Sequence, residues 1–155
     1  MSLTIGAPAP DFSLPASGNR TVSLESLKGQ PFLLYFYPRA DTPGCTKEAC
    51  AFEEALPQLG NLGLTVIGVS KDSMKAIEKF AVKYNLTFPL ASDPEVKVID
   101  AYGAWQEKSM YGKKYMGIER STVLVDAKGI VAKIWPKVKV EGHAADVLQA
   151  VKALG

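Results

Sequence analysis

Apolar runs and helical patterns alternate along the first half of the chain. Residues 31–37, PFLLYFY, form a continuous apolar run of the kind found in a strand buried on both faces, and residues 64–70 repeat the pattern more weakly. Between these runs, residues 43–59 predict an amphipathic helix, because apolar side chains recur there at helical spacing, at Phe52, Ala55, Leu56 and Leu59. A strand, a helix and a second strand in close succession predict a βαβ unit with parallel strands.

The second half predicts another helix, a strand pair and a terminal helix. Asp72 or Ser73 can cap a helix whose buried face carries Met74, Ile77, Phe80, Ala81 and Tyr84. Residues 121–126 and 130–135 predict two strands joined by a turn over 126–129, and residues 143–154 predict the last helix. The order β-α-β-α-β-β-α, which ends in an antiparallel pair, is that of a thioredoxin-like α/β fold. We therefore expect three layers, α/β/α.

Two further segments lie outside this order. Residues 11–27 predict an N-terminal hairpin around Gly18-Asn19, followed by a short helix at 23–28. Residues 101–118 fit no clean period, and their aromatic residues and lysines would also suit a platform for single-stranded nucleic acid. No wider basic surface supports that reading. We expect a packed excursion in which Tyr102, Trp105 and Tyr111 cover the core or line a site.

Composition and charge narrow the class of protein. The length of 155 residues, with 47% hydrophobic and 22% charged residues, is typical of one globular domain spanning residues 1–155. No stretch approaches the ~20 apolar residues of a membrane span, and no signal peptide is visible, which favours the cytoplasm. A net charge of +2 implies neither a nucleic-acid nor a membrane partner. Two cysteines and the single His143, expected at the surface, cannot form a structural zinc site, and we expect no metal.

Cys45 lies where the backbone most alters the chemistry of a cysteine. It follows the C-terminal end of a predicted central strand, the edge at which open α/β sheets place their sites. Thr42 can cap the next helix, Pro43 suits its first position, and Gly44 leaves room for a substrate at the backbone. Cys45 then lies in the first turn, where free N–H groups and the helix dipole stabilise a thiolate. A small buried apolar cysteine is the commoner alternative in general, but this helix start favours a nucleophile.

The spacing of Cys50 from Cys45 limits what the two thiols can do together. On an intact helix, five residues give a rotation of ~140° and a rise of ~7.5 Å, so the two Cα atoms stand ~8.7 Å apart. A disulfide needs a Cα separation below about 7 Å. The pair can therefore bond only if the start of the helix unwinds. A core residue with no redox role is the alternative for Cys50.

The residues around Cys45 resemble a known family. Residues 38–45, PRADTPGC, resemble the peroxiredoxin signature of Pro, three residues, Thr, two residues and Cys. The longer LYFYPRADTPGCTKEAC is similar to the bacterioferritin-comigratory, or Q-type, subfamily. The likeness extends from DFSLPASGNRTVSL through MYGKKYMGIERSTVLVD to GHAADVL near the C-terminus, which is nearly the whole chain.

The resemblance implies a thiol-dependent peroxidase that reduces hydrogen peroxide and organic hydroperoxides. Cys45 would be the peroxidatic cysteine, which a peroxide oxidises to a sulfenic acid. Thr42 would hydrogen-bond the thiolate and the peroxide, and Pro38 would shield the thiolate from water. Arg120 corresponds to the family's active-site arginine, whose fork of donors suits the thiolate and the peroxide oxygens.

The same resemblance implies the rest of the cycle. Glu48 would orient the arginine, and Cys50 matches the resolving cysteine that some members carry at this position. The intramolecular disulfide would then be reduced by thioredoxin or a similar dithiol protein. The resemblance also implies a monomer and no cofactor.

Two other functions remain to be weighed against a peroxidase. A thiol–disulfide oxidoreductase of the same fold would carry Cys-x-x-Cys at the helix start, where this chain has Glu48, and a proline before the facing strand, where it has Glu119-Arg120-Ser121. A redox sensor or holdase would be oxidised once, without turnover. Peroxide consumption sustained by a thioredoxin system separates catalysis from sensing.

Overall fold

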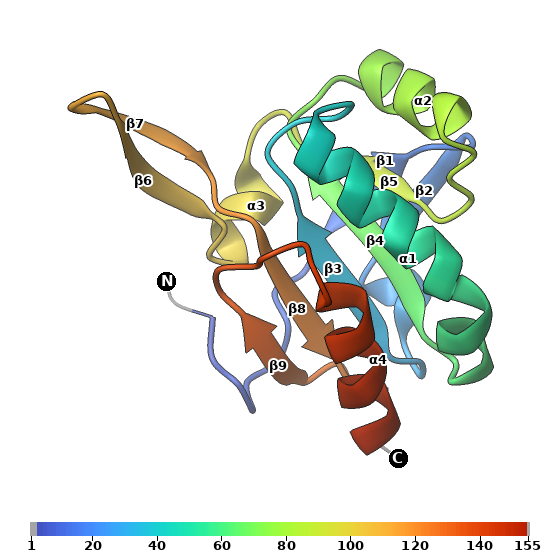
Figure 1. Cartoon of the computed structure of the whole chain (residues 1–155). Coiled ribbons are helices and arrows are strands. Elements are labelled where there is room, and N and C mark those ends of the chain that lie inside the picture. Colours follow the sequence, from blue (N-terminus) through green and yellow to red (C-terminus); the bar gives the residue numbers. More distant parts are fainter. Residues whose placement is uncertain (1–2, 155) are drawn as a thin grey trace.

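A seven-stranded mixed sheet forms the centre of the computed structural model, which describes residues 3–154 (Figure 1). The strand order is β2-β1-β5-β4-β3-β8-β9. In this sheet β3 pairs in parallel with β4 and antiparallel with β8. The strands are β1 (Ser13–Ala16), β2 (Arg20–Ser23), β3 (Phe32–Phe36), β4 (Thr65–Ser70), β5 (Leu90–Ser92), β8 (Ser121–Val125) and β9 (Val131–Trp135).

The helices are distributed unequally over the two faces of the sheet. Three of them, α1 (Pro43–Asn61), α2 (Met74–Lys83) and α4 (His143–Ala153), share one apolar core. The short α3 (Lys97–Ala101) and the 3₁₀ helix η1 (Glu25–Leu27) contribute to the apolar core on the other face. The thioredoxin-like three-layer fold is thus present, with one thick and one thin helical layer.

The central strand β3 links the two cores. Its five residues are all buried, and alternate side chains point to opposite faces. Phe32, Leu34 and Phe36 enter the core beneath α3, whereas Leu33 and Tyr35 enter the core beneath α1. On the neighbouring strand, a Cβ at Gly68 would lie 2.7 Å from the Tyr35 ring. Only glycine leaves space there for this buried tyrosine.

Most elements agree with the sequence predictions. The helix expected over 43–59 is α1, and the strands expected over 31–37 and 64–70 are β3 and β4. The Ser73 Oγ accepts a hydrogen bond from Ala76 N at 3.2 Å, which confirms Ser73 as the cap of α2. The N-terminal hairpin turns through Gly18 and Asn19, both with positive φ.

Three features differ from the predictions. The strand β5 and the helix α3 were not expected, because three and five residues are too few to show a period. Residues 101–118 are largely a separate hairpin, β6 (Trp105–Met110) and β7 (Lys113–Ile118), which projects from the body of the molecule (Figure 1). Tyr102 and Trp105 do cover the core, but Tyr111 at the hairpin tip is 97% exposed, so the prediction for that residue was wrong.

His143 is the third difference, since it is buried rather than at the surface. It is the first residue of α4 and points into the interior, where its Nε2 lies 2.8 Å from the Thr122 hydroxyl of β8. The rings of Phe52 and Trp135 meet it edge to face. Burial lowers the pKa of His143 to about 4, so the ring is neutral near pH 7.

Candidate active site

Cys45 lies in the first turn of α1, just beyond the C-terminal end of β3. Thr42 takes the N-cap position with extended backbone, Pro43 follows at the first helical position, and Cys45 is the third helical residue. The Cys45 side chain is only 2% exposed. Cys45 therefore lies in the first turn, as the sequence predicts, where helix N–H groups lack intrahelical partners. Its burial also screens the side chain from water.

Arg120 and Glu48 complete a group of three side chains around the sulfur. The Arg120 Nη2 donates to Cys45 Sγ at 3.3 Å, and the Arg120 Nη1 donates to Glu48 Oε1 at 2.6 Å. Arg120 reaches the group from the residue just before β8, while Glu48 lies one turn after Cys45 on α1. The charged bond to Glu48 fixes the plane of the guanidinium, so its second nitrogen faces the sulfur.

Gly44 allows the guanidinium to come this close to the helix. A Cβ at this position would stand 3.2 Å from Arg120 Nη2, tighter than an ordinary van der Waals contact. The space at the Gly44 backbone is therefore occupied by Arg120, whereas the sequence suggested that a substrate would use it.

Burial dominates the electrostatics of Glu48. Its side chain is 2% exposed, and its Oε2 has no hydrogen-bond partner among the described residues. Desolvation raises the Glu48 pKa from 4.5 to about 7, although the Arg120 charge and hydrogen bond oppose the rise. Near neutral pH the carboxyl group is therefore close to the midpoint between its neutral and ionised forms.

Thr42 and Pro38 lie in the loop that joins β3 to α1, outside this group of contacts. The Thr42 side chain does not cap the helix: its Oγ1 donates to Arg39 O at 2.9 Å, three residues back. The expected hydroxyl cap is therefore wrong, because the tight turn over 39–42 engages the hydroxyl first. Pro38 is exposed, directly after the buried Tyr37.

Two aspartates hold this loop in place. The sequence pattern did not single out Asp41, and it indicated Asp72 only as a possible helix cap. Asp41 has a φ of 60° and accepts bonds from Lys83 Nζ at 2.9 Å and from the Tyr84 hydroxyl at 2.7 Å. Asp72 Oδ2 accepts from Ala40 N at 2.8 Å. The only signal in the sequence was Asp41, directly before the helix start at Thr42-Pro43, and an aspartate there is equally typical of an ordinary turn.

Cys50 lies on the same continuous helix as Cys45, and both thiols are free. Cys50 is partly exposed, whereas Cys45 is buried. With α1 intact, five residues of helix keep the two Cα atoms beyond the reach of a disulfide. The structure therefore presents the reduced pair in a helix that must open before the two sulfurs can meet.

The arrangement suits nucleophilic sulfur chemistry. A cysteine at a helix start on a thioredoxin-like sheet, with a guanidinium at the sulfur, defines a thiol-dependent redox enzyme. Among residues 3–154, no group of three or more His, Cys, Asp or Glu side chains is placed to hold a metal ion. No helix in the same range is long and apolar enough to cross a membrane.

Comparison with known proteins gives the family. The chain belongs to the AhpC/TSA family, whose model matches residues 5–134. A curated relative from Coxiella burnetii that carries the Bcp peroxiredoxin name is 51% identical over 148 residues, which cover 96% of this chain and 98% of the relative. Peroxiredoxin Bcp of Bacillus subtilis is 46% identical over 152 residues, 98% of this chain and 97% of the relative.

Solved structures agree with the sequence relatives. The Xanthomonas campestris bacterioferritin comigratory protein, described through its alkyl peroxide reduction, has a TM-score of 0.89 at 42% identity and covers 92% of this chain and 91% of that one. These matches confirm the predicted peroxiredoxin family, the thioredoxin-like fold and the thiol peroxidase activity. Two cysteine mutants of Xanthomonas campestris peroxiredoxin Q change positions much farther apart in sequence than Cys45 and Cys50.

Proposed function

We propose that Cys45 is the residue that attacks the peroxide and that Arg120 stabilises the reacting oxygens. The observation that carries this assignment is the hydrogen bond of 3.3 Å from Arg120 Nη2 to Cys45 Sγ at the start of α1. A guanidinium stays protonated at any working pH, so its donors are always available. Glu48 acts as a positioning residue through its bond to Arg120.

The first step oxidises Cys45. The thiolate sulfur attacks one peroxide oxygen, the O–O bond breaks, and the sulfur keeps that oxygen as a sulfenic acid. The second oxygen leaves with the bonding electron pair, takes up a proton and departs as water or an alcohol. Donors already aimed at the reacting oxygens lower the barrier, because negative charge builds up there. The alkyl peroxide reduction described for the Xanthomonas relative supports organic hydroperoxides as substrates alongside hydrogen peroxide.

Thr42 and Pro38 lie in the loop that leads from β3 to the first turn of α1 and Cys45. We assign to the Thr42 hydroxyl a contact with the incoming peroxide, which requires it to leave Arg39 O. Pro38 limits the access of water, since it directly follows the buried Tyr37 and offers no backbone N–H. Both assignments rest on the family signature and on the place of these residues in the loop.

The second step forms the disulfide. The first turns of α1 unwind, the Cys50 thiolate attacks the Cys45 sulfenic sulfur, and the hydroxyl group leaves as water after taking up a proton. The two cysteines mutated in Xanthomonas peroxiredoxin Q lie much farther apart in sequence than Cys45 and Cys50. The assignment of Cys50 as the resolving cysteine therefore rests on the present chain and not on that relative. It is supported by the partial exposure of Cys50 on the helix that begins at Cys45.

A dithiol protein such as thioredoxin then reduces the disulfide, and the monomer is the working unit. Turnover requires repeated reduction, which a compartment with a reducing thiol pool supplies, and this supports the predicted cytoplasmic location.

Intact mass measured without reductant tests the assignment. One equivalent of hydrogen peroxide should remove two hydrogens and both alkylation sites from the wild type, without forming a dimer. Cys45→Ser should remain unoxidised, and Cys50→Ser should gain one oxygen on the remaining thiol. Two free thiols in the treated wild type would end the peroxidase assignment of Cys45. Full turnover with thioredoxin in Cys50→Ser would end the resolving role of Cys50.

A further inference from the structure

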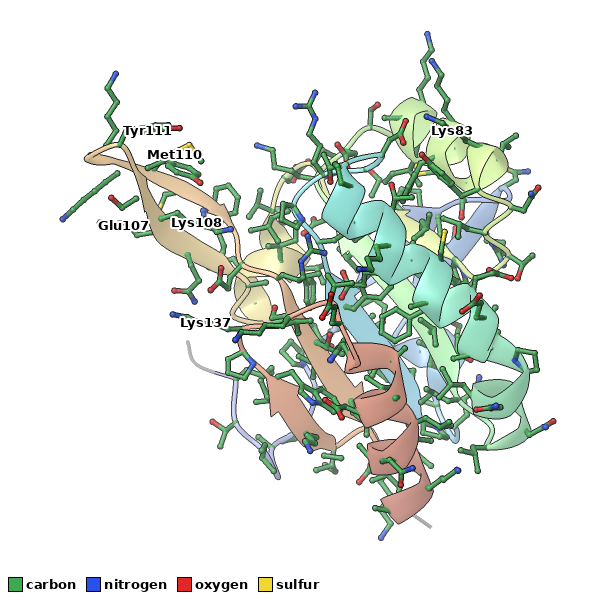
Figure 2. The ribbon with its side chains drawn as sticks, in the orientation of Figure 1. Lys83, Glu107, Lys108, Met110, Tyr111 and Lys137 are labelled. Atoms are coloured by element: carbon green, nitrogen blue, oxygen red, sulfur yellow. The ribbon has the colours of Figure 1, made fainter. Side chains whose placement is uncertain are left out.

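The hairpin formed by β6 and β7, residues 105–118, projects from the body as an isolated two-stranded sheet (Figure 1). We call it the β6–β7 arm. Figure 2 shows Met110 and Tyr111 at its outer end, away from the sheet and the helices. Neither long edge of the arm pairs with another strand among residues 3–154. Nothing in the peroxidase chemistry derived above uses the outer half of this arm.

The arm carries an unusual share of exposed apolar side chains. Half of the large hydrophobic residues that are exposed among the described residues belong to it: Met110 at 56%, Tyr111 at 97%, Tyr115 at 44% and Met116 at 50%. From the pairing register, Met110 and Tyr115 share one face of the arm and Met116 lies on the other. Single exposed apolar residues are common, but a cluster on a projecting arm is typical of a contact surface.

The turn at the tip of the arm has a tyrosine at a position with positive φ. Tyr111 and Gly112 both have positive φ, 52° and 75°, as a two-residue hairpin turn requires. Asn, Asp or Gly is favoured at the first of these positions, whereas a bulky side chain there is strained. The tyrosine ring has almost no contact that would offset this strain, since it is 97% exposed. Strain without a gain inside the folded chain points to a use outside it.

Charge indicates what the arm would bind. Three lysines, Lys108, Lys113 and Lys114, and one acid, Glu107, give the arm a formal charge of +2, as large as the net charge of the whole chain. Lys114 lies 3.5 Å from Glu107, and Lys113 forms no ion pair within the described residues. An acidic surface with apolar side chains would complement the arm. A second copy would bring an equally basic arm, which disfavours arm-to-arm contact.

The base of the arm adjoins the active site. The chain runs from Ile118, the last residue of β7, through Glu119 directly to Arg120. Lys108 of the arm lies 3.5 Å from Glu119, and Arg120 O accepts from Val138 N at 2.8 Å. A cleft of about 560 Å³ lies between the arm and the segment at Pro136 and Lys137. A protein held by the arm would therefore sit beside Arg120, which contacts the Cys45 sulfur.

We propose that the β6–β7 arm docks the dithiol protein that reduces the Cys45–Cys50 disulfide, through an apolar and acidic face of that protein. This inference rests on the proposed function. In the docked complex a partner thiolate attacks one disulfide sulfur and forms a mixed disulfide. The second partner thiol then displaces the remaining sulfur, so the partner leaves as a disulfide and this chain regains two thiols, with two electrons transferred. The arm holds the partner and takes no part in bond exchange.

Reduction kinetics of the peroxide-oxidised protein test the arm. Bacterial thioredoxin and dithiothreitol are compared as reductants of the wild type, of Tyr111→Asn, of Met110→Ser/Tyr111→Asn and of Lys113→Glu/Lys114→Glu. The rate constant with thioredoxin should fall about 10-fold or more in the double variants, which equals about 1.4 kcal/mol of lost transition-state binding. The rates with dithiothreitol and with peroxide should not change. Added salt should slow the wild type with thioredoxin more than it slows the Lys113→Glu/Lys114→Glu variant.

Tyr111→Asn separates docking from folding. Asparagine tolerates positive φ, so this variant should unfold at the same temperature as the wild type or a higher one, yet react more slowly with thioredoxin. The control variant Lys152→Glu/Leu154→Asn replaces an exposed lysine and an exposed apolar residue at the end of α4, away from the arm. It should leave every rate unchanged.

Several results would overturn the proposal. The docking role would be refuted if the arm variants were reduced more slowly by thioredoxin and dithiothreitol to the same extent. It would also be refuted if their rate constant with thioredoxin did not fall. A wild type that sediments as a dimer while the arm variants are monomers would show that the arm binds a second copy instead. If one equivalent of peroxide forms no disulfide in the wild type, the proposed function itself fails, and the docking role falls with it. If a disulfide forms that dithiothreitol reduces but thioredoxin does not, the proposed function survives and the docking of this reductant is refuted.

Discussion

Replacing Glu48 with glutamine should remove much of the loss of stability that the protein shows as the pH rises, while slowing its reaction with peroxide. Burial raises the Glu48 pKa from 4.5 to about 7. A carboxyl group whose pKa is raised by folding binds its proton more tightly in the folded chain than in the unfolded one. The wild type therefore loses stability as the pH rises from about 4.5 to about 7. A pKa difference of this size corresponds to about 3 kcal/mol in the free energy of unfolding.

Glutamine removes this pH dependence. The Glu48→Gln variant should match the protonated wild type near pH 4.5, apart from a constant cost of about 1–3 kcal/mol if its amide lacks a partner where Oε2 now lies. Between about pH 4.5 and pH 8, the variant should gain up to about 3 kcal/mol relative to the wild type. The reaction with peroxide should slow about 10-fold, because a neutral acceptor holds the Arg120 guanidinium less firmly than a carboxylate.

Urea unfolding followed by circular dichroism, repeated across this pH range, measures the difference. Both proteins carry Cys45→Ser in that experiment, so that titration of the thiol does not contribute. Glu54→Gln, an exposed site on the same helix, is the control and should show a much smaller change with pH. A constant difference between Glu48→Gln and the wild type at every pH would refute the argument that burial raises this pKa.

Three further substitutions follow from the packing. Gly44→Ala should slow the oxidation of Cys45 about 10-fold without loss of stability, since its Cβ would press on Arg120, whereas Gly60→Ala on the same helix meets nothing within 4 Å and should have no effect on that rate. Gly68→Ala should lower the free energy of unfolding in urea by about 1–3 kcal/mol through overpacking. Folding lowers the His143 pKa to about 4, so its contribution of about 3 kcal/mol is present above about pH 6.5 and is lost as the pH falls toward 4. The melting temperature should therefore drop less on acidification in His143→Gln than in the wild type.

The sequence predictions were most accurate for segments in which the local residue pattern itself reflects burial or backbone conformation. The run over 31–37 became β3 because both faces of that strand are covered, so apolar residues are needed at every position. The helix start at Thr42-Pro43-Gly44-Cys45 was visible because proline and glycine restrict or free the backbone in known ways. The same local reasoning predicted Cys45 as the nucleophile.

Contacts between distant residues were beyond that reasoning. Arg120 and Glu48 are separated by 72 residues in sequence, and only the family resemblance placed them together. His143 looked like a surface residue because histidine at a helix start is usually exposed, and its burial depends on how α4 crosses β8 and β9. Tyr111 was expected to pack because it is aromatic. The arm that carries it has both faces open, so the apolar alternation that identifies a strand is missing.

The placement of both cysteines on one helix has an energetic consequence. If Cys45 and Cys50 pair as we propose, the disulfide form exists only with the first turns of α1 undone, and reduction lets those turns re-form. The free energy of rewinding then adds to the driving force for reduction. For a two-electron couple, each 1.4 kcal/mol of rewinding raises the reduction potential by about 30 mV. More stable first turns of α1 would thus make the disulfide easier to reduce and harder to form.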